Sequence, residues 1–175
     1  ERHETQILWS AVRGKFTYAV PGVFARGQMP ERISVSMELC SECLGYNHDY
    51  KSDITFSLNG HELCTYTSPG DFGNRYGTFT PSWWYPETTK YGSLVNIEVD
   101  ASGIWLNGQF YSGRHTLESL VFEKTGRILF QIEVKKDAKH AGGFNLFGEK
   151  FGDYPQGIVF RAFYPETDNR GTEEY

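Results

Sequence analysis

The strongest constraint on the fold of this chain is an alternation of apolar and polar residues, with a period of two, that recurs in several short runs. The clearest runs are 33–39, 54–58, 94–99, 128–134 and 158–164. Successive side chains of a β-strand point to opposite faces, so each run predicts a strand with one buried face. Aromatic residues make up 16% of the chain, which also favours strands over helices. The sequence therefore predicts an all-β fold.

Two Asn-Gly pairs predict tight hairpins within this pattern. One pair, Asn59 and Gly60, directly follows the run at 54–58, and the other lies at residues 107–108. Asn and Gly are the residues that best tolerate the two positive-φ positions of a type I′ turn. The strands on either side of each pair are therefore predicted to be antiparallel neighbours.

The order of the predicted strands indicates a sandwich. Runs 5–12 and 15–20 lie on either side of Gly14, and a third hairpin is predicted there. Eight or nine strands separated by turn residues predict a two-sheet antiparallel β-sandwich, of the jelly-roll type. A chain of 175 residues suits one such domain, at residues 1–165, followed by a polar tail at 166–175.

Charge and composition limit the partners of the chain. Acidic residues outnumber basic ones by 22 to 17, giving a net charge of -5, so a basic face for nucleic acid is not expected. No apolar run approaches the ~18 residues of a membrane-spanning helix, and no signal peptide is seen. Three cysteines, an odd number, fit a reducing compartment. Because the chain starts at Glu1 without methionine, we expect an excised domain of a cytoplasmic protein with no membrane contact.

The segment at residues 65–92 carries the strongest functional signal. Its sequence, TYTSPGDFGNRYGTFTPSWWYPETTKYG, holds eight aromatic residues, three prolines and four glycines, with neither a helical nor a strand period. Proline and glycine interrupt strands, so a long loop is predicted. Long irregular loops in compact domains are commonly binding segments. In the alternative interpretation the rings pack on the sandwich and only anchor the loop.

Aromatic rings beside planar polar groups match the chemistry of sugar binding. The C–H face of a sugar stacks on an aromatic ring, while its hydroxyls need hydrogen-bonding partners. A second Gly-rich stretch, at 139–156, adds polar side chains, and the two loops are predicted to meet at one end of the sandwich. The predicted ligand-binding residues are Asp71, Asn74, Arg75, Trp83, Trp84, Tyr85, Tyr91, His140, Asn145 and Glu149.

The cysteines have the gross spacing of a zinc site, although neither a metal nor a cofactor is predicted. Cys40 and Cys43, taken with His61 and Cys64, would supply four ligands. Simple alternation places His61 and Cys64 on opposite faces of a predicted strand, which disfavours this arrangement. Free reduced thiols are the alternative interpretation.

A calcium site is a second metal hypothesis. Asn47, Asp49 and Asp53 carry oxygen ligands at near-alternate positions before a predicted strand. The glycine and terminal glutamate of a complete EF-hand loop are missing. Capping of turns by these side chains is therefore the interpretation that the sequence favours.

Three segments of the chain carry a family resemblance. They are MELCSECLGYNHDYKSDITFSLNG (37–60), the motifs SPGDFGNRYG, PSWW and TKYG (68–92), and KKDAKHAGGFNLFGEKFGDYPQGIVFRAFY (135–164). Together they resemble the C-terminal effector domain of bacterial ArsR-type winged-helix transcription regulators. The resemblance covers most of the chain and implies a β-sandwich that senses a small molecule. It also implies an upstream winged-helix domain, through which alone DNA would be bound, and it assigns no binding residue.

Three functions are compatible with these patterns. The first is a regulator's sensor domain for a carbohydrate or similar polar small molecule. The second is the carbohydrate-binding module of a glycoside hydrolase, and the third is a homodimerisation scaffold in which the rings at 83–91 are buried against a second copy. Catalysis is not predicted, because the sequence has no HExxH, GxSxG, Walker A or GxGxxG motif and its acids show no paired spacing.

Overall fold

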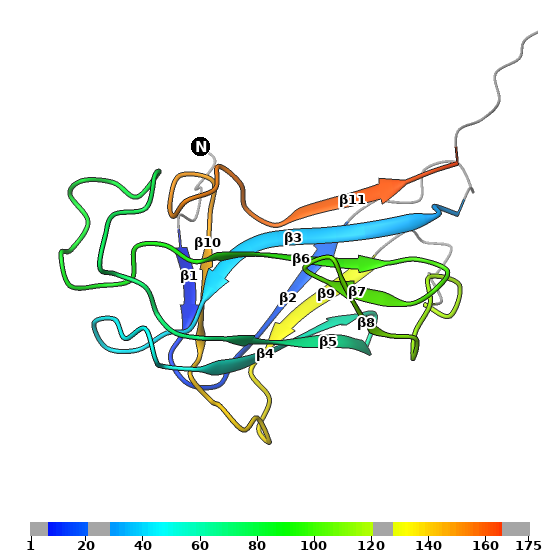
Figure 1. Cartoon of the computed structure of the whole chain (residues 1–175), viewed down its shortest axis with the longest axis horizontal. Helices are drawn as coiled ribbons and strands as arrows, with labels where there is room; N and C mark the ends of the chain where they lie inside the picture. Colours follow the sequence, from blue (N-terminus) through cyan, green and yellow to red (C-terminus); the bar gives the residue numbers. More distant parts are fainter. Residues whose placement is uncertain (1–6, 21–28, 121–127, 166–175) are drawn as a thin grey trace, which may run out of the picture.

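The computed structural model describes residues 7–20, 29–120 and 128–165. Within these ranges the chain forms eleven β-strands in two antiparallel sheets (Figure 1). The prediction of an all-β sandwich is therefore confirmed. None of the described residues belongs to a helix that could span a membrane.

The two sheets differ in size. The larger sheet runs, in spatial order, through β1 (Ile7–Ser10), β10 (Phe144–Phe147), β3 (Arg32–Cys40), β6 (Ser93–Val99), β7 (Ile104–Leu106) and β8 (Gln109–Ser112), and β11 (Val159–Phe163) also pairs with β3. The smaller sheet runs through β2 (Lys15–Val20), β9 (Ile128–Glu133), β4 (Ser52–Leu58) and β5 (His61–Ser68). Their inner faces enclose one hydrophobic core.

The strand pairs are nested, which defines a jelly roll. β4 pairs with β5, β3 with β6, β2 with β9 and β1 with β10, so each pair encloses the previous one along the chain. The hairpin β7–β8 follows β6, and β11 extends the larger sheet after the last nested pair. This arrangement of eight strands in two sheets is the jelly-roll topology, as predicted.

Both Asn-Gly pairs form the predicted tight turns. Asn59 (φ 47°) and Gly60 (φ 81°) join β4 to β5, and Asn107 (φ 50°) and Gly108 (φ 78°) join β7 to β8. These four residues adopt the left-handed conformation that a type I′ turn requires. The local sequence signal was sufficient because the turn itself determines which strands pair.

The hairpin predicted around Gly14 is wrong. β1 pairs with β10 in the larger sheet, whereas β2 pairs with β9 in the smaller sheet. The chain therefore passes from one sheet to the other between these strands. A Cβ atom on Gly14 would lie 2.0 Å from Ser10 Oγ, so the close approach at this crossing requires glycine. Alternation shows which face of a strand is buried but not which strand it joins.

β3 was predicted to be half-buried, and this prediction is wrong. Ile33, Val35, Met37 and Leu39 face the core as expected, but Ser34, Ser36 and Glu38 on the other face are also buried. The segment at 148–157 covers this outer face, where Gln156 Nε2 donates to Ser36 Oγ at 3.1 Å. β3 therefore contacts the core on one side and the 148–157 segment on the other.

Glu38 fixes the position of that loop. The backbone N–H groups of Gly92, Asp153 and Tyr154 donate to its carboxylate over distances of 2.7–3.0 Å. Gly152 has a φ of 87°, and a Cβ atom there would lie 2.4 Å from the Glu38 carboxylate oxygens. A glycine is thus required where the loop passes over the carboxylate, which is 0% exposed.

We expect the protein to lose stability as the pH rises through the pKa of Glu38. Burial raises the pKa of this carboxyl above 4.5, against the opposing effect of its backbone hydrogen bonds. The folded protein therefore keeps a proton that the unfolded chain has released. The Glu38 contribution to the free energy of unfolding is fully present below 4.5 and is lost as the pH rises through the higher folded pKa.

Urea unfolding of the wild type and of Glu38→Gln, between roughly pH 4 and pH 7, measures this contribution. The amide does not titrate, so the wild type should lose more stability with rising pH than the variant does. The difference between the two pH slopes removes the effect of all other carboxyl groups. Equal slopes would show that the folded pKa of Glu38 is not raised.

Candidate functional site

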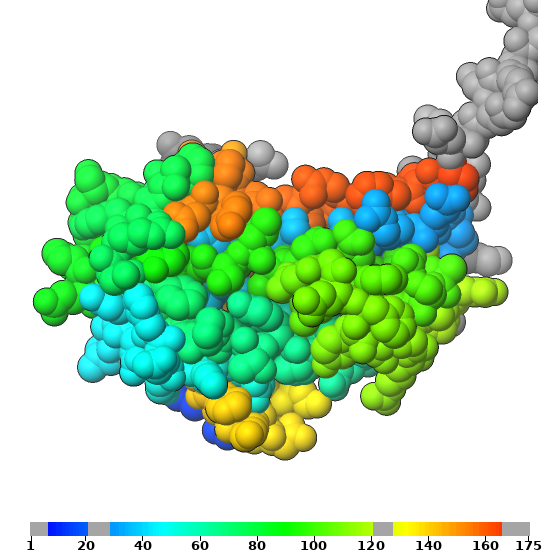
Figure 2. All heavy atoms as spheres, in the orientation of Figure 1, coloured from blue at the N-terminus to red at the C-terminus, as the bar shows by residue number. Residues whose placement is uncertain are grey.

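The aromatic loop meets the 148–157 segment at one end of the sandwich. This contact confirms the prediction for the second half of the 139–156 stretch, whereas residues 144–147 of that stretch form the strand β10. Figure 2 shows the aromatic loop and the 148–157 segment in contact, the first in green and the second in orange. Phe79 N donates to Gly152 O at 2.8 Å, and the rings of Trp84 and Phe151 pack edge to face with centroids 4.9 Å apart. The end of the jelly roll is therefore built by two segments that are distant in the sequence.

Arg75, a predicted ligand-binding residue, joins the two loops, and two others, Tyr91 and Asn74, interact with it or with each other inside the aromatic loop. Arg75 makes two hydrogen bonds to the Asp153 carboxylate, at 2.6 and 2.9 Å, and its guanidinium lies 3.7 Å from the centre of the Tyr91 ring. The Tyr91 hydroxyl donates to Asn74 Oδ1 at 2.7 Å. The Arg75 guanidinium holds the pKa of Asp153 below its usual value. The Arg75 guanidinium, the Tyr91 hydroxyl and Asn74 Oδ1 are thus already paired within the protein.

Asp71, also predicted to bind ligand, is a buried acceptor within the loop structure. It is 0% exposed and accepts hydrogen bonds from Cys43 N and Thr89 Oγ1, each at 3.0 Å. Burial raises the pKa of its carboxyl, and the hydrogen bond from Cys43 N partly opposes this effect. Asp71 therefore joins the segment after β3 to the end of the aromatic loop.

Lys90 stabilises the same loop from inside. Its side chain is buried, and its ammonium donates to the backbone carbonyls of Gly73, Pro86 and Thr88. The ammonium also lies 5.2 Å from the centre of the Tyr76 ring. A buried ammonium with several carbonyl partners fixes an irregular backbone that lacks a strand ladder.

The tryptophans of the loop have different environments. Trp83 and Tyr85 are 71% and 68% exposed, whereas Trp84 points inward and donates from Nε1 to Thr89 O at 3.0 Å. Glu149 is also exposed. Other large apolar side chains that are exposed in the loops 41–51, 69–92 and 148–157 are Leu44, Tyr46, Tyr50, Tyr76, Phe79 and Tyr154.

The candidate binding site is a pocket at this end of the larger sheet, which we name the outer pocket. It has a volume of about 220 Å³. It is lined by Ile7, Trp9, Glu42, Cys43, Leu44, Gly45, Trp84, Thr88, Thr89 and Asn145. Among the predicted ligand-binding residues, Trp84 and Asn145 line this pocket.

The pairing of β1 with β10 brings together two residues that line the outer pocket. Trp9 of β1 lies directly opposite Asn145 of β10, so the two side chains share the outer face of the sheet. Asn145 is 1% exposed, and its Nδ2 donates to Glu42 Oε2 at 2.6 Å and to Ser41 O at 2.8 Å. Burial raises the pKa of the Glu42 carboxyl, while the bond from Asn145 opposes this effect. The pocket thus combines indole rings with a fixed amide–carboxyl pair.

Trp9 and Glu42 were not among the predicted ligand-binding residues. Trp9 lies in a short strand near the start of the described chain, and Glu42 follows β3 in an unremarkable polar stretch. These two residues lie close to Asn145 because β10 pairs with both β1 and β3. The available signal was a tryptophan that is 58% exposed on a strand, but exposure itself is visible only in the folded chain.

The strand β5 contains a bulge that changes the predicted orientation of His61. Phe56 is opposite Cys64 and Leu58 is opposite His61, so Leu63 is an extra residue in this strand. Opposed residues share a face of the sheet, and Phe56 and Leu58 share the core face. The prediction that His61 and Cys64 lie on opposite faces is therefore wrong.

The cysteines are free thiols in separate places. Cys40 and Cys64 are buried in different sheets, and Cys43 lies at the outer pocket. In the described ranges, no group of three or more His, Cys, Asp or Glu side chains is arranged to hold a metal ion. Burial raises the pKa of Cys43 to about 11, so its thiol is protonated at neutral pH.

Two of the three side chains considered for calcium, Asn47 and Asp53, instead accept hydrogen bonds from the protein. Asn47 Oδ1 accepts from Asp49 N at 2.9 Å, and the Asp53 carboxylate accepts from Thr67 Oγ1 at 2.8 Å. His140, a predicted ligand-binding residue, donates from its backbone N–H to Asp53 at 2.9 Å and places Nδ1 3.2 Å from the same carboxylate. His140 thus contacts β4 of the smaller sheet and does not line the outer pocket.

Comparison with known proteins gives no relative. No protein-family model matches the chain, and no curated protein and no solved structure matches it either. The resemblance to regulator effector domains therefore stays a prediction. The residues of the outer pocket are the basis on which a function can be inferred.

Proposed function

We propose that this domain binds a neutral, polar, ring-shaped small molecule, such as a sugar, in the outer pocket. The supporting observation is that the indoles of Trp9 and Trp84 line the same pocket as the hydrogen-bonded pair Asn145 and Glu42. Indole faces stack on C–H groups, and amide and carboxyl groups bind hydroxyls. A volume of about 220 Å³ is below the ~300–1,000 Å³ of drug-sized sites and suits a single sugar ring.

The lining of the outer pocket favours binding over catalysis. Of the described residues that line it, Glu42 is the one carboxylic acid, whereas glycoside hydrolysis ordinarily uses two. Asp71 is paired behind the pocket with Cys43 N and Thr89 Oγ1. The Cys43 thiol, with a pKa of about 11, is a poor nucleophile.

The biological setting that we propose for this binding is ligand sensing by a cytoplasmic bacterial transcription regulator. The resemblance to ArsR-type effector domains supports this setting, and DNA would then be bound by a separate winged-helix domain. A carbohydrate-binding module is the alternative setting, because the same pocket chemistry would serve it. The exposed rings of Trp83 and Tyr85 lie beside the pocket rather than in it and are available for a homodimer contact.

Trp9→Ala is expected to weaken sugar binding at least about fivefold without unfolding the protein, since removal of one stacking ring costs about 1 kcal/mol or more. A thermal-shift screen with neutral mono- and disaccharides would first identify a ligand, and titration calorimetry would then give its dissociation constant. Trp9 is 58% exposed, so its loss leaves the core intact.

Trp83→Ala is the matched control, because Trp83 is exposed at the same end of the molecule but does not line the pocket. The dissociation constant of this variant for the sugar should stay within about twofold of the wild-type value. If both variants lose affinity equally, the ligand binds on the exposed loop instead. If no sugar in the panel binds the wild type, the proposal is wrong in its ligand class.

A further inference from the structure

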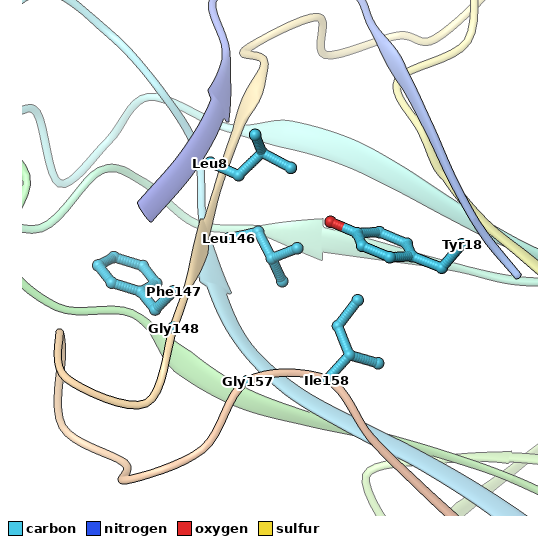
Figure 3. Close-up of a pocket in the computed structure, with 7 residues that line it drawn as sticks. All are labelled: Leu8, Tyr18, Leu146, Phe147, Gly148, Gly157 and Ile158. Carbon is cyan, nitrogen blue, oxygen red and sulfur yellow. The ribbon is translucent and has the colours of Figure 1, made fainter. Parts of the chain in front are cut away.

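A second pocket lies between the two sheets, and we name it the inner pocket. Its volume is about 390 Å³. It is lined by Leu8, Tyr18, Leu146, Phe147, Gly148, Gly157 and Ile158 (Figure 3). Leu8 and Leu146 lie next in sequence to Trp9 and Asn145, so on these strands they point to the opposite face from the outer pocket.

The topology of the larger sheet creates this space. β10 pairs with Leu39 and Cys40 at one end of β3, and β11 pairs with 32–36 at the other end. Between these contacts the chain leaves the edge of β3 and loops outward. Phe147 and Ile158 lie at the two ends of this excursion, and Tyr18 of β2 approaches from the smaller sheet.

The lining of the inner pocket is apolar apart from one hydroxyl. Figure 3 shows the Tyr18 ring reaching toward Leu146, with its oxygen at the tip and Ile158 on one side. Within the described part of the chain, this hydroxyl makes no hydrogen bond. None of the described residues that line the pocket carries a charge. Burial raises the pKa of Tyr18, so the hydroxyl is neutral and can both donate and accept.

We propose that the inner pocket binds an uncharged, mainly apolar small molecule with one hydroxyl or carbonyl oxygen that hydrogen-bonds to the Tyr18 hydroxyl. The volume lies within the ~300–1,000 Å³ typical of small-molecule sites. The aliphatic walls take the apolar body of the ligand, and Tyr18 supplies the polar contact that orients it. The absence of charge among the described lining residues selects against ions, because a buried charge would have no partner. The two pockets share no lining residue, so this proposal does not rest on sugar binding in the outer pocket.

The test uses 1-octanol as the probe, with octanoate as its charged counterpart. Titration into the whole protein at neutral pH, followed by calorimetry and by NMR of the Leu and Ile methyl groups, should show saturable binding of octanol. Octanoate should bind at least about tenfold more weakly, since its carboxylate is desolvated without a cation. Tyr18→Phe should weaken octanol binding about two- to tenfold through loss of the hydrogen bond.

Leu146→Trp should abolish octanol binding by filling the pocket, and Leu129→Trp is its matched control. Leu129 is 41% exposed on β9 and is not part of the lining, so this variant should bind as the wild type does. Ile158→Trp, at the partly exposed end of the pocket, replaces Leu146→Trp if the latter does not fold. Undiminished binding by the folded filled variant, or no saturable binding by the wild type, would overturn the site. Equal binding by Tyr18→Phe would overturn the proposed hydrogen bond, and equal binding of octanoate would overturn the uncharged ligand class.

Discussion

Phe56→Ala is expected to destabilise the protein by about 3–5 kcal/mol, the cost of removing a fully buried phenylalanine and leaving a cavity. Phe56 is 0% exposed in β4, and its ring stacks on that of Phe130 with centroids 6.1 Å apart. The pair lies in the core between the sheets, where neighbouring strands cannot collapse into the space without breaking their ladders. Equilibrium unfolding in urea measures the loss.

Phe110→Ala is the control for this experiment. Phe110 is 54% exposed on β8 and contacts Trp105 edge to face, with centroids 5.3 Å apart. Its removal should cost about 1 kcal/mol or less. If both variants lose a similar amount of stability, the packing of Phe56 in the core contributes no more to stability than an exposed ring does.

Lys90→Met is expected to cost about 2–4 kcal/mol, although methionine retains much of the apolar length of lysine. The substitution leaves the carbonyls of Gly73, Pro86 and Thr88 without the ammonium that they bind. Relief of the cost of burying a charge offsets part of this loss, which is why the expected value is below the sum of the separate hydrogen bonds. The loop that carries Trp84 and Thr89 should then become mobile, and sugar binding in the outer pocket should be lost with it.

Urea unfolding and amide hydrogen exchange of residues 72–90 would test this expectation. Lys135→Met is the matched control, because Lys135 forms an exposed ion pair with Glu62 at 2.9 Å. Exposed pairs of this kind contribute about 0–1 kcal/mol. If Lys90→Met is no more destabilising than Lys135→Met, the buried ammonium does not hold the loop.

The fold was predictable wherever its signal was local. Asn59 and Gly60 determined the β4–β5 hairpin because a two-residue turn places the two flanking strands side by side as antiparallel neighbours. β1 and β2 had no such turn, and their alternation was equally compatible with a hairpin and with separate sheets. The outer face of β3 was also unpredictable, because Ser36 and Glu38 are polar residues that are buried under a loop far along the chain.

The candidate site was predictable in its location but not in its residues. Composition placed the two loops together, and hydrogen bonds between Arg75 and Asp153, 78 residues apart, bear this out. Composition could not show that Arg75 would be paired within the protein rather than offered to a ligand. Trp9 lies opposite Asn145 because β1 pairs with β10. Nothing in the sequence of either strand predicts this pairing.

The nesting of the strand pairs also predicts an order of folding. A two-residue turn joins β4 to β5, whereas β1 pairs with β10 across nearly the whole described chain. Closing a longer loop costs more entropy, and long-range pairing slows folding, so we expect the innermost pair to form early and the outermost pair late. Both pockets depend on that outermost pair, since Trp9, Asn145, Leu8 and Leu146 all lie on it. During refolding, ligand binding should therefore recover more slowly than the core forms. The rate of that recovery would measure the rate at which β1 pairs with β10.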